Sequence, residues 1–103
     1  MTHIIVLFNL KDGVDPSDYE TWAKSTDLPI VRGLDSIDSF SVFRASGLIG
    51  SDAQPPYQYV EVISVGDMTR FGEEIASETM QKVAAEFQEH ADNPLFLMTE
   101  SID

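Results

Sequence analysis

The sequence predicts an α+β fold in which a four-stranded antiparallel sheet carries helices on one of its faces. The first observation is the order of its segments, because hydrophobic periodicity indicates strand, helix, two strands, helix and strand along the chain. The second is that the helix–strand unit of residues 19–44 recurs after residue 66. Right-handed crossovers place both helical regions on the same face, which gives the ferredoxin-like βαββαβ arrangement. A chain of 103 residues without an internal linker forms a single domain, residues 1–103.

The first strand is predicted at residues 3–10, HIIVLFNL, which are almost continuously apolar and therefore suit a strand covered on both faces. Because side chains alternate along a strand, His3, Ile5, Leu7 and Asn9 share one face, and Ile4, Val6, Phe8 and Leu10 share the other. We expect the set that contains His3 to face the helices and the set that contains Phe8 to face a second subunit.

The first helical region should begin after Asp15, a typical N-cap residue, with Pro16 at the first helical position. Its apolar residues fall within a sector about 100° wide, which predicts one buried stripe. The stripe consists of Tyr19, Trp22, Ala23, Thr26 and Ile30. Pro29 has no backbone N–H donor, so the helix should kink or restart near Asp27 and end at Gly33.

The second and third strands are predicted at residues 37–44 and 57–65, joined through a loop at residues 46–56 that is rich in glycine and proline. Alternation allows Phe40 and Val42 to face the helices together with Gln58, Val60 and Val62. The residues Tyr57, Tyr59, Glu61 and Ile63 are then expected on the opposite face.

The second helical region should begin at Asp67 and be broken once. Its apolar residues form two stripes about 140° apart at 100° per residue, and one straight helix cannot bury both against the same sheet. We therefore predict a break at residues 76–79, with Ser77 capping the second piece. Asn93 and Pro94 should end this helix, and the last strand is predicted at residues 95–102.

Composition excludes several classes of function. The formal net charge of −12 makes nucleic-acid binding improbable, because such a surface repels phosphate backbones. No run of about 18 apolar residues is present, so we expect no membrane span. The absence of cysteine excludes thiolate metal sites and fits a cytoplasmic protein. The apolar sheet face without helices would be unusually large for a monomer, so we predict a homodimer that pairs two sheets face to face.

The stretch YETWAKSTDLPIVRGLDSIDSFSVFR, followed by YQYVEVISV, resembles the dimeric α/β barrel superfamily. Within it, the chain is most similar to the REDY-like (HapK) proteins, which are found with genes for prodigiosin-like tripyrrole pigments and related alkaloids. The resemblance implies a pocket between sheet and helices in each subunit, lined by apolar side chains and a few polar groups.

Members of the superfamily suggest roles for individual residues. The opening HIIVL is similar to the first strand of plant polyketide cyclases of this fold, where a histidine faces the pocket. The resemblance therefore implies that His3 faces the pocket. The cyclases have a second histidine on the third strand, and this chain has Gln58 or Tyr59 at that position instead. The haem-degrading members use an asparagine late in the first strand, matched by Asn9, but also a tryptophan on the second helix. The only tryptophan of this chain, Trp22, lies on the first helix, which argues against the haem reaction.

The residues themselves leave alternatives open for each candidate. His3 is either a general base, since its ordinary pKa lies near 6.5, or a partly wet histidine at a strand end. Asp27 is either a proton acceptor beside the buried stripe or simply the N-cap of a short helical piece. Glu61 is most simply a polar partner at the dimer face; burial would raise its pKa and permit proton transfer.

The function predicted from these observations is a small cytoplasmic enzyme without metal or redox cofactor. It would bind an aromatic heterocycle, of the pyrrole or indole type, and promote condensation, cyclisation or proton transfer. The predicted catalytic residues are His3 and Asp27. The predicted substrate-binding residues are Asn9, Tyr19, Trp22, Val42, Gln58, Val60, Phe71 and Phe87. Two alternatives remain: a cofactor-free monooxygenase of the same fold, for which Asn9 and Trp22 are the relevant residues, and a carrier that delivers an intermediate without converting it.

Overall fold

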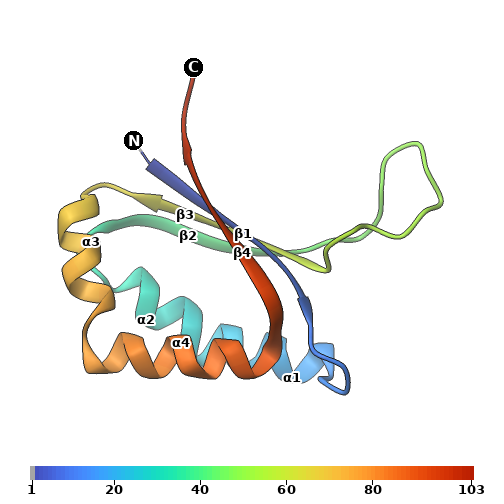
Figure 1. Cartoon of the computed structure of the whole chain (residues 1–103), viewed down its shortest axis with the longest axis horizontal. Coiled ribbons are helices and arrows are strands. Elements are labelled where there is room, and N and C mark those ends of the chain that lie inside the picture. The colour runs from blue at the N-terminus through green and yellow to red at the C-terminus, as the bar shows by residue number, and fades with distance from the viewer. Residues whose placement is uncertain (1) are drawn as a thin grey trace.

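The computed structural model describes residues 2–103, which form one sheet and one layer of helices (Figure 1). In chain order the elements are β1 (Thr2–Leu10), α1 (Pro16–Trp22), the π-helical turn η1 (Ala23–Asp27), α2 (Leu28–Arg32), β2 (Ile37–Arg44), β3 (Tyr59–Val65), α3 (Met68–Ile75), α4 (Glu78–His90) and β4 (Ala91–Glu100). The predicted element order is therefore confirmed.

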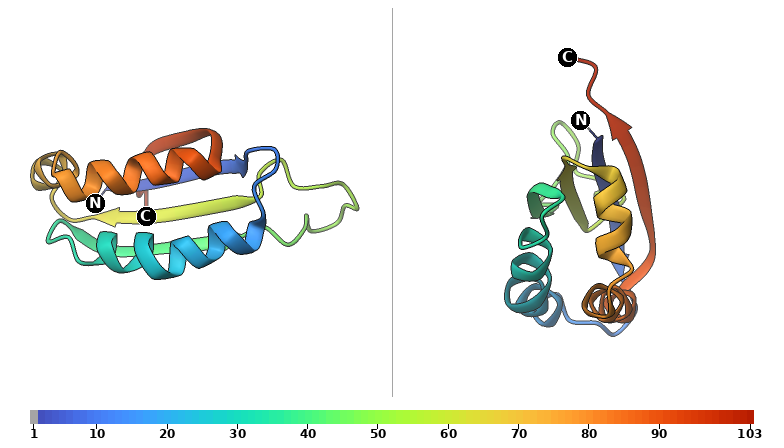
Figure 2. Two further views of the ribbon diagram at one scale, coloured as in Figure 1. Left: turned by 90° about the horizontal axis from the view of Figure 1, so that it is seen from below. Right: turned by 90° about the vertical axis from the view of Figure 1, so that its left-hand side faces the viewer.

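The sheet has the strand order β2-β3-β1-β4, and all three neighbouring pairs are antiparallel. The register places Ile5 opposite Val62 of β3 and opposite Leu97 of β4. All helices lie on one side of this sheet (Figure 2). The predicted ferredoxin-like α+β fold is confirmed.

The first helical region is a single path broken by a π-helical turn. The Asp15 side chain accepts a hydrogen bond from the backbone N–H of Ser17, so the predicted N-cap is present. The break near Asp27 is also present: the N–H of Leu28 bonds to the carbonyl of Ala23, five residues earlier. Pro29 directly follows and has no N–H to offer, which fits the local loss of the regular α-helical pattern.

The second helical region is divided as predicted. Asp67 caps α3 by accepting from the N–H of Arg70, and Ser77 caps α4 by accepting from the N–H of Met80. The short α3 stands at one end of the molecule and descends from the sheet to α4 (Figures 1 and 2). Some predicted boundaries were wrong. The helix α4 ends at His90 and β4 begins at Ala91, before Asn93 and Pro94, and β4 ends at Glu100 instead of residue 102. The strand β3 begins at Tyr59 instead of residue 57. Pro94 is tolerated because β4 is an edge strand.

The predicted faces of β1 and β3 were wrong and are exchanged in the structure. Ile4, Val6 and Phe8 are buried beneath the helices, together with Tyr59 and Ile63 of β3. The aromatic rings explain this choice. Phe8 stacks on Tyr59, with ring centroids 5.5 Å apart, and meets Tyr19 and Phe87 edge-on at 5.4 Å and 4.9 Å. Such a cluster buries more apolar area than the set that contains His3 and Asn9 would.

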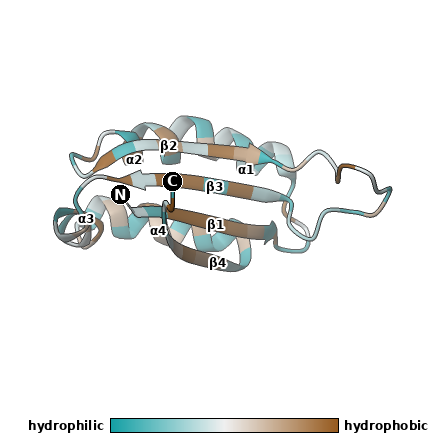
Figure 3. Ribbon diagram, turned by 90° about the horizontal axis from the view of Figure 1, so that it is seen from above, coloured by the Kyte–Doolittle hydropathy of each residue, from teal (hydrophilic) through white to brown (hydrophobic). Residues whose placement is uncertain are grey.

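The opposite face of the sheet carries no helix and remains largely apolar. Register and alternation place the following apolar side chains on it: Ile5, Leu7, Phe43, Val60, Val62, Leu95 and Leu97. Phe43 is 55% exposed, and Leu95 and Leu97 are each 45% exposed. Viewed from this side, β1 is hydrophobic along most of its length (Figure 3). We call this surface the open face.

Candidate functional site

A cavity of about 410 Å³ lies between the sheet and the helices. Every strand contributes to its wall, as do η1, α2, α3 and α4, and nearly all of the contributed side chains are apolar. The lining residues are Ile4, Asp27, Val31, Phe40, Glu61, Ile63, Phe71, Ile75, Met80, Val83, Ala84, Phe87, Gln88, Phe96 and Met98. A cavity of this volume and apolarity is typical of sites for small organic molecules.

Asp27 enters the cavity from the π-helical turn. Its residue surface is 6% exposed, and its side chain makes no cap hydrogen bond, so the N-cap alternative is wrong. No donor among residues 2–103 pairs with its carboxylate. Burial alone therefore acts on this group and raises the pKa of Asp27 to about 6. Short π-helical turns occur often at functional sites, which fits this placement.

Glu61 enters the cavity from the middle of β3 and is 5% exposed. Burial, and then the charge of Asp27, raise the pKa of Glu61 to about 8. One hydrogen bond acts in the other direction, because the hydroxyl of Tyr19 donates to Glu61 Oε2 at 3.3 Å. This distance exceeds the usual 2.7–2.8 Å or so for O–H···O, so the bond is weak.

The two acids have different protonation states near neutral pH. With a pKa of about 6, Asp27 is mostly ionised at pH 7, whereas Glu61, with a pKa of about 8, is mostly protonated. Two carboxyl groups held in one apolar cavity with separated pKa values can act as base and acid in the same reaction. The site is therefore suited to moving protons on a bound molecule.

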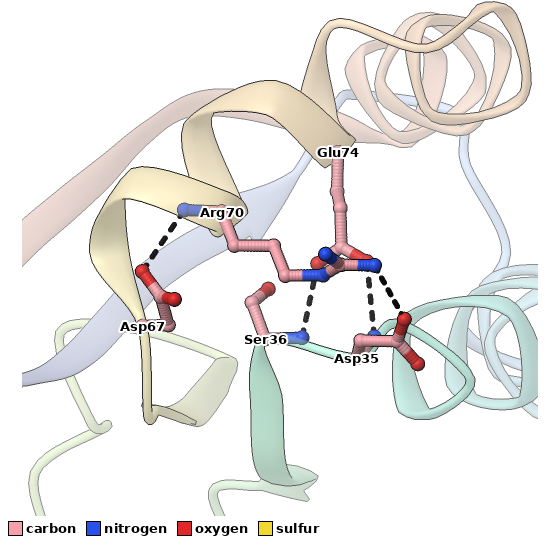
Figure 4. Close-up of polar contacts among 5 residues, drawn as sticks. All are labelled: Asp35, Ser36, Asp67, Arg70 and Glu74. Atoms are coloured by element: carbon pink, nitrogen blue, oxygen red, sulfur yellow. Dashed lines mark hydrogen bonds and ion pairs between the residues drawn. The ribbon is translucent and has the colours of Figure 1, made fainter.

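The wall formed by α3 is fastened to the start of β2 (Figure 4). The carboxylate of Glu74 accepts the backbone N–H groups of Asp35 and Ser36, each at 3.0 Å. Arg70 pairs with Asp35 at 2.6 Å and lies 3.8 Å from Glu74. These contacts, chiefly those of Ser36, lower the pKa of Glu74. They hold Phe71 and Ile75, which lie on the same short helix, at the cavity.

A smaller hollow of about 190 Å³ lies beside the α1 end of the sheet and is lined by another acidic residue, Glu20. Glu20 Oε2 accepts from the Tyr59 hydroxyl at 2.7 Å and pairs with Arg44 Nε at 3.0 Å. The Tyr59 bond and then the charge of Arg44 lower the pKa of Glu20, while burial opposes them. Burial and the bond to Glu20 raise the pKa of Tyr59 to about 12.

The structure brings three of the predicted site residues to the cavity: Asp27, Phe71 and Phe87. Tyr19 and Val42 line the smaller hollow instead, and Tyr19 reaches the cavity only through its hydroxyl bond to Glu61. Trp22 is half-buried and packs against the core residues Tyr19 and Phe87, away from the lining of the cavity. It donates its indole N–H to Glu86 at 2.8 Å and stacks on His90 at 5.2 Å.

Four further predicted site residues also lie away from the cavity, and their predicted placement is corrected. His3 is on the open face, with Nδ1 2.9 Å from the Ser64 hydroxyl. Val60 shares that face. Asn9 accepts from the N–H of Gln58, and the Gln58 side chain accepts from the N–H of Leu10, so both amides fasten the end of β1 to the chain before β3. The exchanged faces of β1 and β3 explain all four displacements.

Sequence reasoning missed Glu61 as a residue of the cavity because it assigned β3 to the wrong face. A signal was present: Glu61 is the only charged residue in YVEVISV, a strand otherwise rich in β-branched residues. A charge in such a strand has to be either at an interface or inside, and both positions perturb its pKa.

Two further observations concern metal binding and membrane insertion. Within residues 2–103, no three histidine or acidic side chains are grouped in a way that would hold a metal ion. None of the helices in this part of the chain combines the length and apolarity required to cross a membrane.

Comparison with solved structures places the fold among known ones. HapK from Hahella chejuensis shares 29% identity and a TM-score of 0.78, covering 99% of this chain and 93% of that protein. SnoaB from Streptomyces nogalater, described as a cofactor-independent oxygenase, shares 11% identity with a TM-score of 0.77, covering 99% and 93%. A protein of unknown function from Thermobifida fusca, described as dimeric and ferredoxin-like, shares 14% with a TM-score of 0.74, covering 97% and 90%. No curated protein sequence matches the chain.

The sequence model of one family, described as REDY-like protein HapK, matches residues 2–102. The match spans β1 to the end of β4 and so includes every element that lines the cavity. Because it covers nearly all of the chain, the protein belongs to the family of REDY-like HapK proteins.

Proposed function

We propose that this protein is a cofactor-independent enzyme of specialised metabolism that binds an aromatic heterocycle in the cavity and catalyses a condensation, cyclisation or proton transfer. One observation carries the proposal: an apolar cavity that contains two buried acids of different pKa, Asp27 and Glu61. Membership of the HapK family supports a pyrrole-type pigment or related alkaloid intermediate as the substrate.

The two acids divide the work of a condensation between them. As the new carbon–carbon bond forms, Glu61 donates its proton to the carbonyl oxygen, which becomes a hydroxyl, and Asp27 accepts the proton that leaves the attacked ring carbon. Asp27 then passes this proton to the hydroxyl, which leaves as water, and Glu61 takes up the ring N–H proton, so that both acids return to their starting states. Phe40, Phe71 and Phe87 hold flat rings and exclude water, which strengthens both proton transfers. Orientation of the two partners contributes several kcal/mol, on the order of 7 in good cases.

The active form is proposed to be a homodimer in the cytoplasm. The open face presents apolar side chains that include Phe43, Leu95 and Leu97, and burying them in a sheet-to-sheet contact would remove a large patch from water. The dimeric description of the T. fusca neighbour supports the same arrangement. The absence of cysteine fits the cytoplasm.

Binding is tested with methionine methyl groups as reporters. Met80 and Met98 line the cavity and Met68 does not, so a heterocycle in the cavity shifts the first two methyl resonances and leaves the third unchanged. Pyrrole-2-carbaldehyde and 2,4-dimethylpyrrole are suitable probes, because their condensation joins the aldehyde carbon to the pyrrole carbon and releases water. Shifts confined to Met68, or none, would contradict the proposed site.

Turnover of these probes separates an enzyme from a carrier. An enzyme accelerates the coloured condensation, and Asp27→Asn or Glu61→Gln abolishes the acceleration. A carrier binds both probes without acceleration. The monooxygenase alternative was based on Asn9 and Trp22, neither of which lines the cavity, so the geometry adds no support to it.

A further inference from the structure

The cavity has an uncompensated negative charge. Asp27 is 6% exposed and lines the cavity, yet no donor among the described residues pairs with it. The ionisable groups that face the pair are Tyr19 and the two acids themselves; the lining residues of α3 and α4 include no titratable side chain. Among residues 2–103, Ser36 Oγ is the only fully buried side-chain polar atom without a partner, so the Asp27 oxygens are open to the cavity. A carboxylate that is largely removed from water and has no donor is costly to the folded protein. A ligand in the cavity that supplies donors and a positive charge reduces this cost.

Basic residues are kept away from the cavity. None of the lysine or arginine side chains is among its lining residues. Lys24 and Arg44 lie at the smaller hollow, and Arg70 is engaged by Asp35 and Glu74 between α3 and the start of β2. The net charge of −12 adds a long-range field that attracts cations and repels anions. An anionic ligand would thus meet two acids and no counter-charge inside.

The hydrogen-bonding capacity of Glu61 is only half used. Tyr19 donates to Oε2, and no donor among residues 2–103 pairs with Oε1. The cavity therefore offers the Asp27 carboxylate as an acceptor, between walls that accommodate a flat ring. Oε1 of Glu61 becomes a second acceptor once the positive charge of a bound ligand lowers the pKa of Glu61 and releases its proton. A planar group with N–H donors in its plane, such as an amidinium or a protonated azaheterocycle, fits this combination of charge and acceptors.

We infer that the ligand of this cavity is a planar heteroaromatic cation with N–H donors, held by Asp27 and by the free oxygen of Glu61. This inference rests on the proposed function and adds the charge of the substrate to it. The unpaired, buried carboxylate of Asp27 distinguishes the site from an ordinary group of surface acids.

The test compares three probes of nearly equal shape at pH 7: pyrrole-2-carboxamidine, a cation; pyrrole-2-carboxamide, which is neutral; and pyrrole-2-carboxylate, an anion. Affinity is measured by calorimetry and location by the methyl resonances of Met80 and Met98. We expect the amidinium to bind about tenfold or more tightly than the amide, as for a charge-assisted hydrogen bond, and the carboxylate not to bind. Asp27→Asn should abolish the preference for the cation.

Glu89→Gln is the matched control, because it removes one negative charge from an exposed position of α4 that does not line the cavity. It should leave the preference for the cation unchanged. Equal affinities for cation and amide, or tighter binding of the carboxylate, would overturn the inference and leave the proposed heterocycle site intact. If none of the probes shifts Met80 or Met98, both proposals fail. Should Asp27→Asn not fold, the ranking of the three probes on the unaltered protein still decides.

Discussion

Glu20 and Glu61 are both linked to tyrosines of the aromatic core but meet opposite environments. Glu20 receives the Tyr59 hydroxyl at 2.7 Å and the guanidinium of Arg44, and these contacts lower its pKa. Glu61 receives only the long Tyr19 bond of 3.3 Å and shares its cavity with the charge of Asp27. Burial and this charge raise the pKa of Glu61 to about 8.

The difference separates an acid that supports the fold from acids available for chemistry. Glu20 is paired in the way that surface acids usually are, and its partners consume its hydrogen-bonding capacity. Asp27 and Glu61 remain under-paired inside an apolar wall, which disfavours their charged forms and lowers stability. Groups that destabilise the protein where they lie are those most readily explained by function.

The largest effect is expected from Glu61→Gln. Glu61 has a pKa near 8 in the folded protein and about 4.5 in the unfolded chain, so the folded state binds its proton more tightly. Stability from this group is complete below about pH 4.5 and is lost as pH rises through 8. Glutamine keeps the shape without the titration. The variant should gain roughly 3–5 kcal/mol over the original protein at pH 9, and much less at pH 4.

Urea unfolding at several pH values measures this difference, and the matched control is again Glu89→Gln, which should show no such gain. A Glu61→Gln protein whose stability parallels that of the original protein across the whole pH range would mean that Glu61 is hydrated and not buried in the cavity.

Asp27→Asn should act in the same direction over a lower pH range. The pKa of Asp27 is about 6 in the folded protein and near 3.8 when unfolded, so the stability loss of the original protein from this group occurs between these values. The variant should be more stable by roughly 2–3 kcal/mol at pH 8, and yet bind a cationic heterocycle less tightly. Calorimetric unfolding at pH 4 and pH 8 measures the first effect. A less stable variant at pH 8 would indicate hydrogen bonds to Asp27 and contradict its unpaired state.

The fold could be predicted from the sequence because its boundaries are marked by local chemistry. Asp15, Asp67 and Ser77 cap helices by hydrogen bonds to nearby backbone N–H groups, so short-range sequence suffices to locate them. The break at Asp27 follows in the same way from the missing donor of Pro29. Such features depend on residues that are close in the chain.

The site could be predicted only in part, because it depends on which face of each strand turns toward the helices. Alternation fixes which residues share a face but not the choice between the two faces, and β1 is apolar on both. The stacking of Phe8 on Tyr59 decides the choice, and that contact joins residues 51 positions apart. Asp27 was identified because it lies in a helical region, where the apolar stripe shows which side is buried. Glu61 was missed and His3 was misplaced because both lie on strands, for which alternation does not show which face meets the helices.

Glu20→Gln gives the smallest effect and the opposite pH dependence. Its pKa is lowered in the folded protein, so the stability that it contributes is present above the ordinary value of about 4.5 and is lost as pH falls. Glutamine still accepts the Tyr59 hydroxyl but carries no charge for it or for Arg44. The loss of stability should be about 1 kcal/mol at pH 7 and should vanish in acid.

The same urea series therefore gives pH profiles of opposite slope for Glu20→Gln and Glu61→Gln. If both variants gained stability at high pH, repulsion within a highly acidic protein would account for the effect, and the distinction between the paired and the under-paired acids would be lost.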